Sequence, residues 1–193
     1  VHLPEGRLVP LASRTVPDVG RPDTGPVALG ELREPYLPLL SWERAYRDFY
    51  LVNVRTGKAE RAVEKTAAGA SLSPEGKYLL YFRKEEGAWY ARRVADGRVV
   101  NLTAGLRVSF ADEEQDRPDY PDAYGAAAWT KGDRHVLLYD RYDIWVVDPD
   151  TAQARCLTAS LGRKRKLVFR YQDTDPDERA ISPDEPLLLS VTD

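Results

Sequence analysis

Short apolar runs separated by turn residues, most regular between residues 128 and 158, constrain the fold of this chain more than any other feature. The two central runs are Val136–Tyr139 and Ile144–Val147, and the polar residues 140–143 separate them. Runs of four residues are too short for helices, and their β-branched and aromatic residues favour strands. We therefore expect consecutive antiparallel strands joined by hairpins. Because both alternating faces of these runs are apolar, we expect the sheet to be covered on both sides.

The same pattern recurs along the chain. Residues 70–103 repeat the pattern of residues 128–158 at a nearly constant spacing. Leu80 and Leu138 lie 58 positions apart (138 − 80), and Trp89 and Trp145 lie 56 apart (145 − 89). The threonines at 103 and 158 lie 55 apart (158 − 103). A third start appears at residues 181–184, and a partial copy at residues 49–54. A repeat of about 50 residues with several strands in each unit indicates a β-propeller or a related array. We expect Trp89 and Trp145 to occupy matching positions in successive sheets.

Two strings carry a family resemblance that covers about residues 40–193. The string LSPEGKYLLYF at residues 72–82, followed by DG and NLT, resembles the repeat of TolB-like and dipeptidyl-peptidase-IV-like propellers. The string AYGAAAWTKGDRHVLLYDRYDIWVVDPD at residues 123–150 is similar to the propeller of prolyl-oligopeptidase-type serine peptidases of the S9 group. The resemblance implies that an α/β-hydrolase domain lies elsewhere in the parent chain. It also favours a periplasmic or secreted location over a cytoplasmic one.

Composition excludes several classes of protein. A chain of 193 residues is long enough for one domain with a sizeable core. The formal net charge of −3 gives no reason to expect nucleic acid or an anionic membrane as a partner. No apolar stretch approaches the ~20 residues that a membrane helix needs. The single cysteine, Cys156, rules out an internal disulfide framework, and we expect it to be a small buried residue of a strand.

The chain divides into an arm and a series of units. Half of the fourteen prolines lie within residues 1–38, so we expect this Pro/Gly-rich arm to be irregular. Residues 39–63 form a partial unit that begins with a strand at 39–42, residues 70–103 and 126–158 form complete units, and another unit starts at 181. A closed propeller needs roughly four to eight four-stranded blades. We therefore expect an all-β fold, a partial β-propeller whose terminal sheets expose unpaired edges.

Catalytic groups of a serine hydrolase cannot be assembled from this sequence. The nearest approach to a Gly-x-Ser-x-Gly elbow is residues 69–73, where Ser73 replaces the last glycine, and it falls on the start of a repeat strand. Of the two histidines, His2 lies in the arm, and His135 is expected at the mouth of a hairpin. We expect the chain by itself to show no peptidase or esterase activity.

The sequence predicts no metal and no cofactor. One cysteine and two distant histidines do not make a zinc site. The acidic loop at residues 112–122 could offer oxygen ligands, but its spacing is not that of a twelve-residue calcium loop. No glycine-rich phosphate loop occurs. The loop therefore reads either as a solvated insertion or as part of a binding site.

Two pairs of glutamates are candidates for substrate binding. Propellers of the dipeptidyl-peptidase-IV-like group hold the terminal ammonium of a substrate with paired glutamates. By that resemblance, Glu113 and Glu114 in the acidic loop are the substrate-binding candidates. Glu85 and Glu86 match equally well as a dipeptide, but they are expected in a hairpin turn.

Two further polar features have structural and functional alternatives. The basic run at residues 163–166 could bind phosphate or an acidic partner, although a solvated hairpin between two strands is favoured. Asn101 begins a glycosylation sequon, but the Leu-Thr part of that sequon recurs at 157–158 and therefore belongs to the repeat.

Three functions remain open after the sequence alone. The first is a non-catalytic propeller segment that gates or positions peptide substrate for a separate hydrolase domain. The second is a TolB-like scaffold that binds a protein partner, and the third is a purely structural segment. Residues 187–189 are three consecutive leucines at the start of an incomplete unit. We expect them to pair within the chain, onto the edge of the first unit, or to mediate self-association.

Overall fold

The computed structural model describes residues 6, 8–21, 25–175 and 177–193. In this part of the chain the strands form three four-stranded antiparallel sheets and one two-stranded sheet. The first sheet has the order β1-β2-β3-β4, the second β5-β6-β7-β8, the third β9-β10-β11-β12 and the fourth β13-β14. The fold is therefore all-β, as the sequence predicts, and the described sheets do not close into a ring.

The strand bounds are as follows: β1 Asp18–Val19, β2 Val27–Leu32, β3 Arg47–Asn53, β4 Ala59–Thr66, β5 Ala70–Leu72, β6 Tyr78–Arg83, β7 Ala88–Arg93, β8 Val99–Asn101, β9 Ala126–Trp129, β10 Val136–Tyr139, β11 Ile144–Val147, β12 Ala154–Cys156, β13 Val168–Tyr171 and β14 Leu189–Thr192. Three short helices occur in the described residues: η1 Glu34–Ser41, η2 Lys131–Asp133 and α1 Leu161–Arg165. A helix of eight residues or fewer falls far short of the ~20 residues that cross a bilayer.

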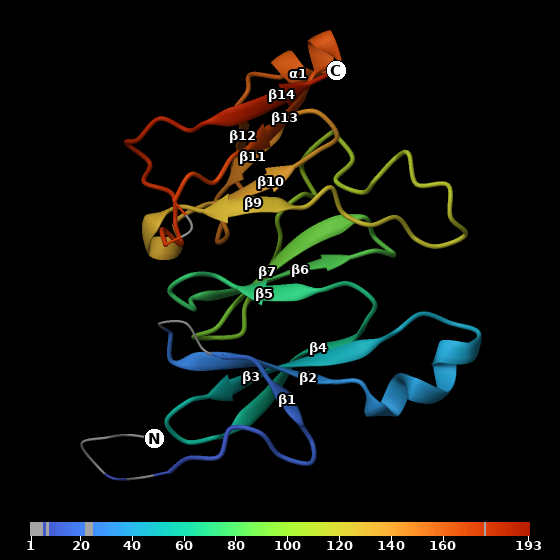
Figure 1. Ribbon diagram of the computed structural model, residues 1–193, viewed down its shortest axis with the longest axis vertical. Coiled ribbons are helices and arrows are strands. Elements are labelled where there is room, and N and C mark those ends of the chain that lie inside the picture. The colour runs from blue at the N-terminus through green and yellow to red at the C-terminus, as the bar shows by residue number, and fades with distance from the viewer. Residues whose placement is uncertain (1–5, 7, 22–24, 176) are drawn as a thin grey trace.

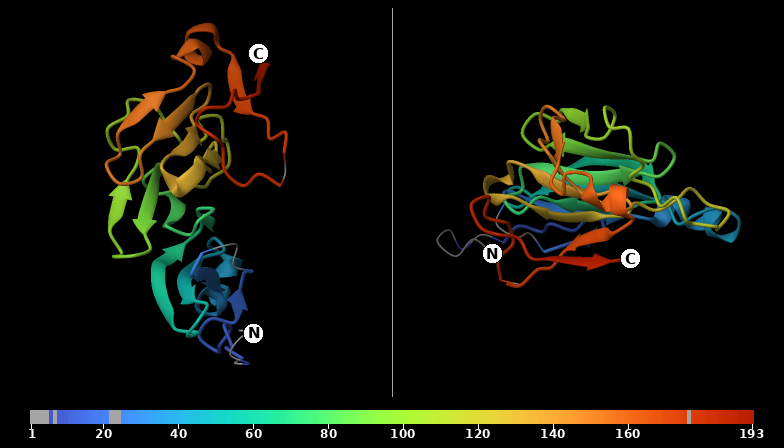
Figure 2. Two further views of the ribbon diagram at one scale, coloured as in Figure 1. Left: turned by 90° about the vertical axis from the view of Figure 1, so that its left-hand side faces the viewer. Right: turned by 90° about the horizontal axis from the view of Figure 1, so that it is seen from above.

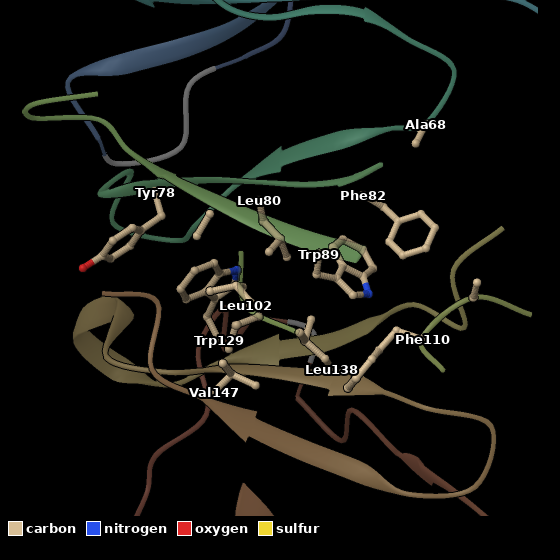
Figure 3. Close-up of a cluster of buried hydrophobic side chains, with 13 residues drawn as sticks. Ala68, Tyr78, Leu80, Phe82, Trp89, Leu102, Phe110, Trp129, Leu138 and Val147 are labelled. Carbon is tan, nitrogen blue, oxygen red and sulfur yellow. The ribbon is translucent and has the colours of Figure 1, made fainter. Parts of the chain in front are cut away.

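The sheets follow one another along the long axis of the molecule, from β1–β4 near the N-terminus to β13–β14 at the other end (Figure 1). Apolar side chains fill each seam between neighbouring sheets. The central cluster, between the second and third sheets, includes Leu80, Trp89, Trp129 and Leu138 (Figure 3). Separate clusters join the first sheet to the second and the third sheet to the fourth. Each inner sheet is thus covered on both faces.

Strand β6 shows why its sequence is apolar throughout. Leu80 and Phe82 face the central cluster, whereas Leu79 and Tyr81 face the first sheet. Successive side chains of a strand point to opposite faces, so a strand between two other sheets buries every residue. The five residues from Tyr78 to Phe82 are all buried, as the sequence predicts for a sheet covered on both sides.

One turn recurs between the third and fourth strands of the first three sheets. The backbone N–H of Asn53 donates to Lys58 O at 2.9 Å, and that of Gly57 donates to Asn53 O at 2.8 Å. The same two bonds recur in the second sheet, from Arg93 and Gly97, and in the third sheet, from Asp148 and Ala152. The residues at the left-handed position are Gly57, Gly97 and Ala152, with φ of 71°, 74° and 57°. The repeated bonds show that the first three sheets share the same turn between their last two strands.

The prediction that residues 1–38 are irregular is wrong for their second half. Strand β2 runs between β1 and β3 and pairs with β3 over six residues. Val27 enters the cluster shared with the second sheet, and Ala28 packs with Val16 on the opposite face. The prolines lie before and after this run, so they interrupt no ladder bond. Residues 1–5, 7 and 22–24 of the predicted arm lie outside the described residues.

The strand predicted at residues 39–42 is also wrong. Residues 34–41 form the 3-10 helix η1 instead, and no residue of η1 is buried. Pro35 near its start has a backbone angle already suited to a helix, and Pro38 lies inside it. The apolar residues at 39 and 40 favour a strand by composition, but the structure places them in η1.

The two repeat tryptophans lie on the same strand of their sheets but not at matching positions. The backbone N–H of Trp89 donates to Thr103 Oγ1 at 3.2 Å, and the corresponding bond in the third sheet runs from the backbone N–H of Ile144 to Thr158 Oγ1 at 3.4 Å. Trp89 therefore corresponds to Ile144, 55 positions on (144 − 89). A shift of one residue moves a side chain to the other face of a sheet. Trp89 and Trp145 consequently face the central seam from opposite walls.

The alignment of Leu80 with Leu138 in the predicted repeat is also wrong by one residue. Leu80 faces the third sheet, and Leu138 faces the second, so both lie in the central cluster. The residue of β10 that faces the next sheet along the chain is Leu137. The corresponding turns give the true offset, since Ser73 and Thr130 make equivalent bonds 57 positions apart (130 − 73).

The tail pairs within the chain, but not with the partner that the sequence suggested. Strand β14 pairs with β13, with Leu189 opposite Tyr171. Leu187 and Leu189 pack against the third sheet, whereas Leu188 is 57% exposed. The predicted pairing with the edge of the first unit is therefore wrong.

Candidate functional site

Irregular segments project from one side of the stacked sheets. The segment between β2 and β3, which contains η1, and the insertion at residues 104–125 both extend to the right in Figure 1, and the view from above agrees (Figure 2). The insertion joins β8 of the second sheet to β9 of the third. The insertion carries Glu113 and Glu114, the substrate-binding candidates that the sequence singled out.

The insertion is a hairpin-like loop with an anchored stem. Asp112 N–H donates to Asp122 O at 2.7 Å, Tyr124 N–H donates to Phe110 O at 3.0 Å, and Ala111 bridges to Ala123. Phe110 is 1% exposed and belongs to the central apolar cluster. The apolar stem thus fixes the acidic tip, residues 113–121, in one position above the seam between the second and third sheets.

Glu113 and Glu114 lie at the start of this tip, and the structure gives them different environments. The Glu114 carboxylate accepts a hydrogen bond from Arg141 Nη2 at 2.6 Å, and the Glu114 side chain is 64% exposed. The backbone N–H of Glu113 donates to the Tyr124 hydroxyl at 2.9 Å. Among the described residues no ion pair occupies the Glu113 carboxylate, which is exposed. The pair therefore offers one free carboxylate beside one that Arg141 neutralises.

The alternative pair, Glu85 and Glu86, lies in the turn between β6 and β7. The Glu86 carboxylate accepts hydrogen bonds from the Tyr90 hydroxyl and from Arg83 Nη1, and these two bonds hold the pKa of Glu86 below its usual value. Glu86 is thus occupied by its own hairpin. Glu85 instead approaches Arg44 of the other projecting segment, at 4.0 Å between Oε1 and Nη1.

A pocket of about 610 Å³ lies where the two projecting segments meet. We call it the Trp42–Tyr120 pocket. Its lining residues come from the segment after η1, from the β6–β7 turn and from the tip of the insertion: Trp42, Glu43, Arg44, Tyr46, Glu85, Pro118, Asp119 and Tyr120. Trp42 is 73% exposed and Tyr120 44% exposed. Sequence reasoning missed this pocket because its lining residues come from three segments that are far apart in the chain.

A second pocket, of about 390 Å³, is lined in part by Gly69, Ala70 and Ser71, the first three residues of the string that resembles an incomplete nucleophile elbow. Ser71 lies in β5 directly opposite Leu80 of β6, so the backbone is extended there and makes no strand-to-helix turn. The Lys84 ammonium at this pocket pairs with the Asp122 carboxylate at 2.5 Å. The pocket walls are otherwise largely alanine, leucine and aromatic side chains.

His135 stands at the mouth of the β9–β10 hairpin, as the sequence predicts. Its backbone N–H donates to Thr130 Oγ1 at 3.0 Å, and its carbonyl accepts from Thr130 N–H. His2 lies outside the described residues. Among the described residues no three or more His, Cys, Asp or Glu side chains converge as a metal site.

The remaining polar features have structural partners. The basic run forms α1 rather than the predicted hairpin, and Arg163 Nη2 donates to the buried Asp140 at 3.2 Å. Asn101 donates to the Tyr90 hydroxyl at 3.0 Å. Cys156 is half-buried rather than fully buried, and its Sγ accepts from Ser160 N–H at 3.1 Å.

Comparisons with known proteins add no identification: no protein-family model matches the chain, and a search of curated proteins finds no match.

Proposed function

We propose that this chain is a non-catalytic segment of a β-propeller from a prolyl-oligopeptidase-type serine peptidase. In this proposal the segment gates or positions peptide substrate for an α/β-hydrolase domain elsewhere in the parent chain. The sequence strings at residues 72–82 and 123–150 support the family, and the recurring turns support a repeated blade-like unit.

The observation that carries the peptide-binding role is the position of the free Glu113 carboxylate. It stands on the same projecting insertion that supplies Pro118, Asp119 and Tyr120 to the Trp42–Tyr120 pocket. An exposed carboxylate attracts the terminal ammonium of a peptide, and a pocket with aromatic walls can take a side chain. The surface therefore has separate positions for the end of a peptide and for one of its residues.

Arg141 sets the strength of this interaction. Its ion pair with Glu114 removes half of the negative charge of the glutamate pair. A peptide ammonium therefore binds mainly to Glu113 and competes with Arg141 for Glu114. Replacing Arg141 with Gln should release Glu114 and strengthen binding of a free amino terminus.

The test compares a peptide that has a free amino terminus with the same peptide acetylated, by isothermal titration with the purified chain. We expect the free amine to bind more tightly, Glu113→Gln to remove that preference, and Arg141→Gln to increase it. Glu185→Gln, an exposed carboxylate in the loop before β14, is the matched control. Equal affinity for the free and acetylated peptides in the unmodified chain would exclude this role.

Two results bear on the link to a peptidase. Extension of the parent sequence beyond Asp193 should reveal a Gly-x-Ser-x-Gly elbow within an α/β pattern. The purified chain should not hydrolyse chromogenic dipeptide or ester substrates. Hydrolysis that a serine-directed inhibitor abolishes would show that the segment is itself catalytic.

The alternative function, a TolB-like protein-binding scaffold, is favoured by the fourth sheet. Leu188, directly before β14, and Val191 within β14 are 57% and 48% exposed. A protein partner, or a second copy of the chain, could cover these side chains and add a strand to the sheet. Light scattering over a range of concentrations distinguishes self-association from a strictly monomeric state.

A further inference from the structure

The Trp42–Tyr120 pocket combines aromatic walls with an excess of negative charge. Trp42, Tyr46 and Tyr120 supply the aromatic rings. Glu43, Glu85 and Asp119 supply three carboxylates, against the single cationic lining residue Arg44. The negative face of an aromatic ring and a carboxylate both attract cations, so this lining selects against anions.

Arg44 already shows how the pocket holds a cation. Its guanidinium carbon lies 4.5 Å from the centroid of the Tyr120 ring, its Nε donates to the Asp119 carboxylate, and its Nη1 lies 4.0 Å from Glu85. A second internal example is adjacent, where Lys65 Nζ lies 4.7 Å from the centroid of the Tyr46 ring. Arg44 and Lys65 thus already make cation–π contacts with tyrosine rings of the lining, and Arg44 also contacts two of its carboxylates.

The Trp42 indole is the unused part of this arrangement. It is 73% exposed, and no cation or ring of the described residues stacks on it. A tryptophan face binds cations more strongly than a tyrosine face does. The volume of about 610 Å³ leaves space beside Arg44 for an incoming side chain.

We propose that the Trp42–Tyr120 pocket binds a basic side chain of a polypeptide, with arginine preferred. When no ligand is bound, Arg44 occupies part of this site. An incoming guanidinium stacks on Trp42 and pairs with Glu85, which Arg44 reaches only at 4.0 Å. Arginine is preferred over lysine because a planar guanidinium stacks on an indole and binds a carboxylate through two parallel hydrogen bonds.

The inference rests on the proposed function only in that the ligand is a peptide. The glutamate pair recognises the amino terminus in that proposal, whereas the Trp42–Tyr120 pocket recognises a side chain. The two claims therefore depend on different atoms of the ligand and can fail separately.

The experiment uses four versions of one short peptide, in which the amino terminus is free or acetylated and the third residue is arginine or citrulline. Citrulline has nearly the shape of arginine but no charge. Binding is followed by isothermal titration and by tryptophan fluorescence, to which Trp42 contributes as the most exposed of the four tryptophans. We expect the arginine peptides to bind about tenfold more tightly than the citrulline peptides, which corresponds to one cation–π contact and one exposed ion pair.

Three variants locate the effect. Trp42→Ala and Glu85→Gln should each reduce the preference for arginine severalfold, and neither removes a buried side chain. Arg44→Gln should strengthen binding of the arginine peptides severalfold, because it removes the competing guanidinium. Glu60→Gln, an exposed carboxylate paired with Arg92 on the second sheet, is the control and should change nothing.

Each outcome decides between the two claims. Equal affinities for arginine and citrulline peptides would overturn the pocket assignment, even if the free amino terminus is still preferred over the acetylated one. Weaker binding to Arg44→Gln would show that Arg44 helps to hold the ligand, and so would overturn its role as the internal occupant. A preference for arginine without any preference for the free amine would support the pocket and contradict the role of Glu113.

Discussion

Asp133, in the turn between β9 and β10 of the third sheet, accepts a hydrogen bond of 2.6 Å from the hydroxyl of Ser73, in the corresponding β5–β6 turn of the second sheet. The same carboxylate accepts from the backbone N–H groups of Glu75 and Lys77, at 3.2 Å each. Asp133 is 1% exposed. One side chain therefore closes the turn of the neighbouring sheet and joins two repeats.

Replacing Asp133 with Ala should lower the free energy of unfolding by roughly 3 kcal/mol, because buried donors left unpaired cost about 1–3 kcal/mol each and part of that is recovered by relaxation. Asp133→Asn should cost less, since one carbonyl oxygen remains. Urea unfolding followed by circular dichroism measures both. The control is Asp96→Ala in an exposed turn, and equal effects of the three variants would contradict this account.

Ala152 occupies the left-handed position that Gly57 and Gly97 occupy in the other two turns, with φ of 57°. A left-handed conformation costs a residue with a Cβ about 1–2 kcal/mol, so glycine at this position avoids that cost. Part of the gain is offset because glycine loses more conformational entropy on folding than alanine does. Ala152→Gly should therefore raise the free energy of unfolding by about 0.5–1 kcal/mol.

The matched control for Ala152→Gly is Ala154→Gly, two residues further on in β12. This substitution should lower stability, because it removes a methyl group that packs against the central cluster and loosens an extended segment. Thermal unfolding of the two variants should shift in opposite directions.

Tyr36 connects η1 to the first sheet, and its contribution to the free energy of unfolding depends on pH. Burial, together with the hydrogen bond from its hydroxyl to Asp48 Oδ1 at 2.6 Å, raises the pKa of Tyr36 from 10.0 to about 12. The neutral phenol is thus favoured in the folded state. Its contribution to stability is complete below pH 10 and is lost as pH rises through about 12.

The free energy of unfolding of Tyr36→Phe should therefore approach that of the unmodified chain as pH rises above 10, after a clear deficit at neutral pH. Chemical unfolding at a series of pH values measures the difference. A deficit that stays constant across this range would show that the hydrogen bond to Asp48 is not the cause. Tyr120→Phe, an exposed tyrosine, serves as the control.

The three consecutive leucines of the tail should respond unequally to substitution. Leu189→Ala should lower the free energy of unfolding by about 1–2 kcal/mol, since its side chain packs partly buried against the third sheet. Leu188→Ala should change it by less than about 0.5 kcal/mol, since that side chain is exposed. Equal losses would mean that the alternation of β14 differs from the structure.

The sequence predicted best where short apolar runs were bounded by turn residues. Strands β6, β10 and β11 fall where that pattern places them, because burial on both faces leaves an apolar signal at every position. Strand β2 was not predicted because prolines precede and follow it, although the strand itself contains no proline. Matching identical letters also misaligned the repeats, since Trp89 corresponds in hydrogen bonding to Ile144 and not to Trp145.

The candidate site was predictable only in part. The acidic character of Glu113 and Glu114 is visible in the sequence, but the pairing of Glu114 with Arg141, 27 positions away, depends on how the third sheet is placed. The contact between Arg44 and Asp119 spans 75 positions. No local pattern reports contacts of that range, so the Trp42–Tyr120 pocket could not be found before the fold was known.

The stacking of the sheets governs how the molecule comes apart. Each apolar seam joins a sheet only to the one before it or the one after it, as in a linear array of repeats. Unfolding from either end therefore breaks one apolar seam before the next. The second and third sheets share the largest cluster, so we expect them to unfold last, as one cooperative unit. Because the acidic insertion is rooted in that unit through Phe110, Glu113 would keep its position after both outer sheets had peeled away.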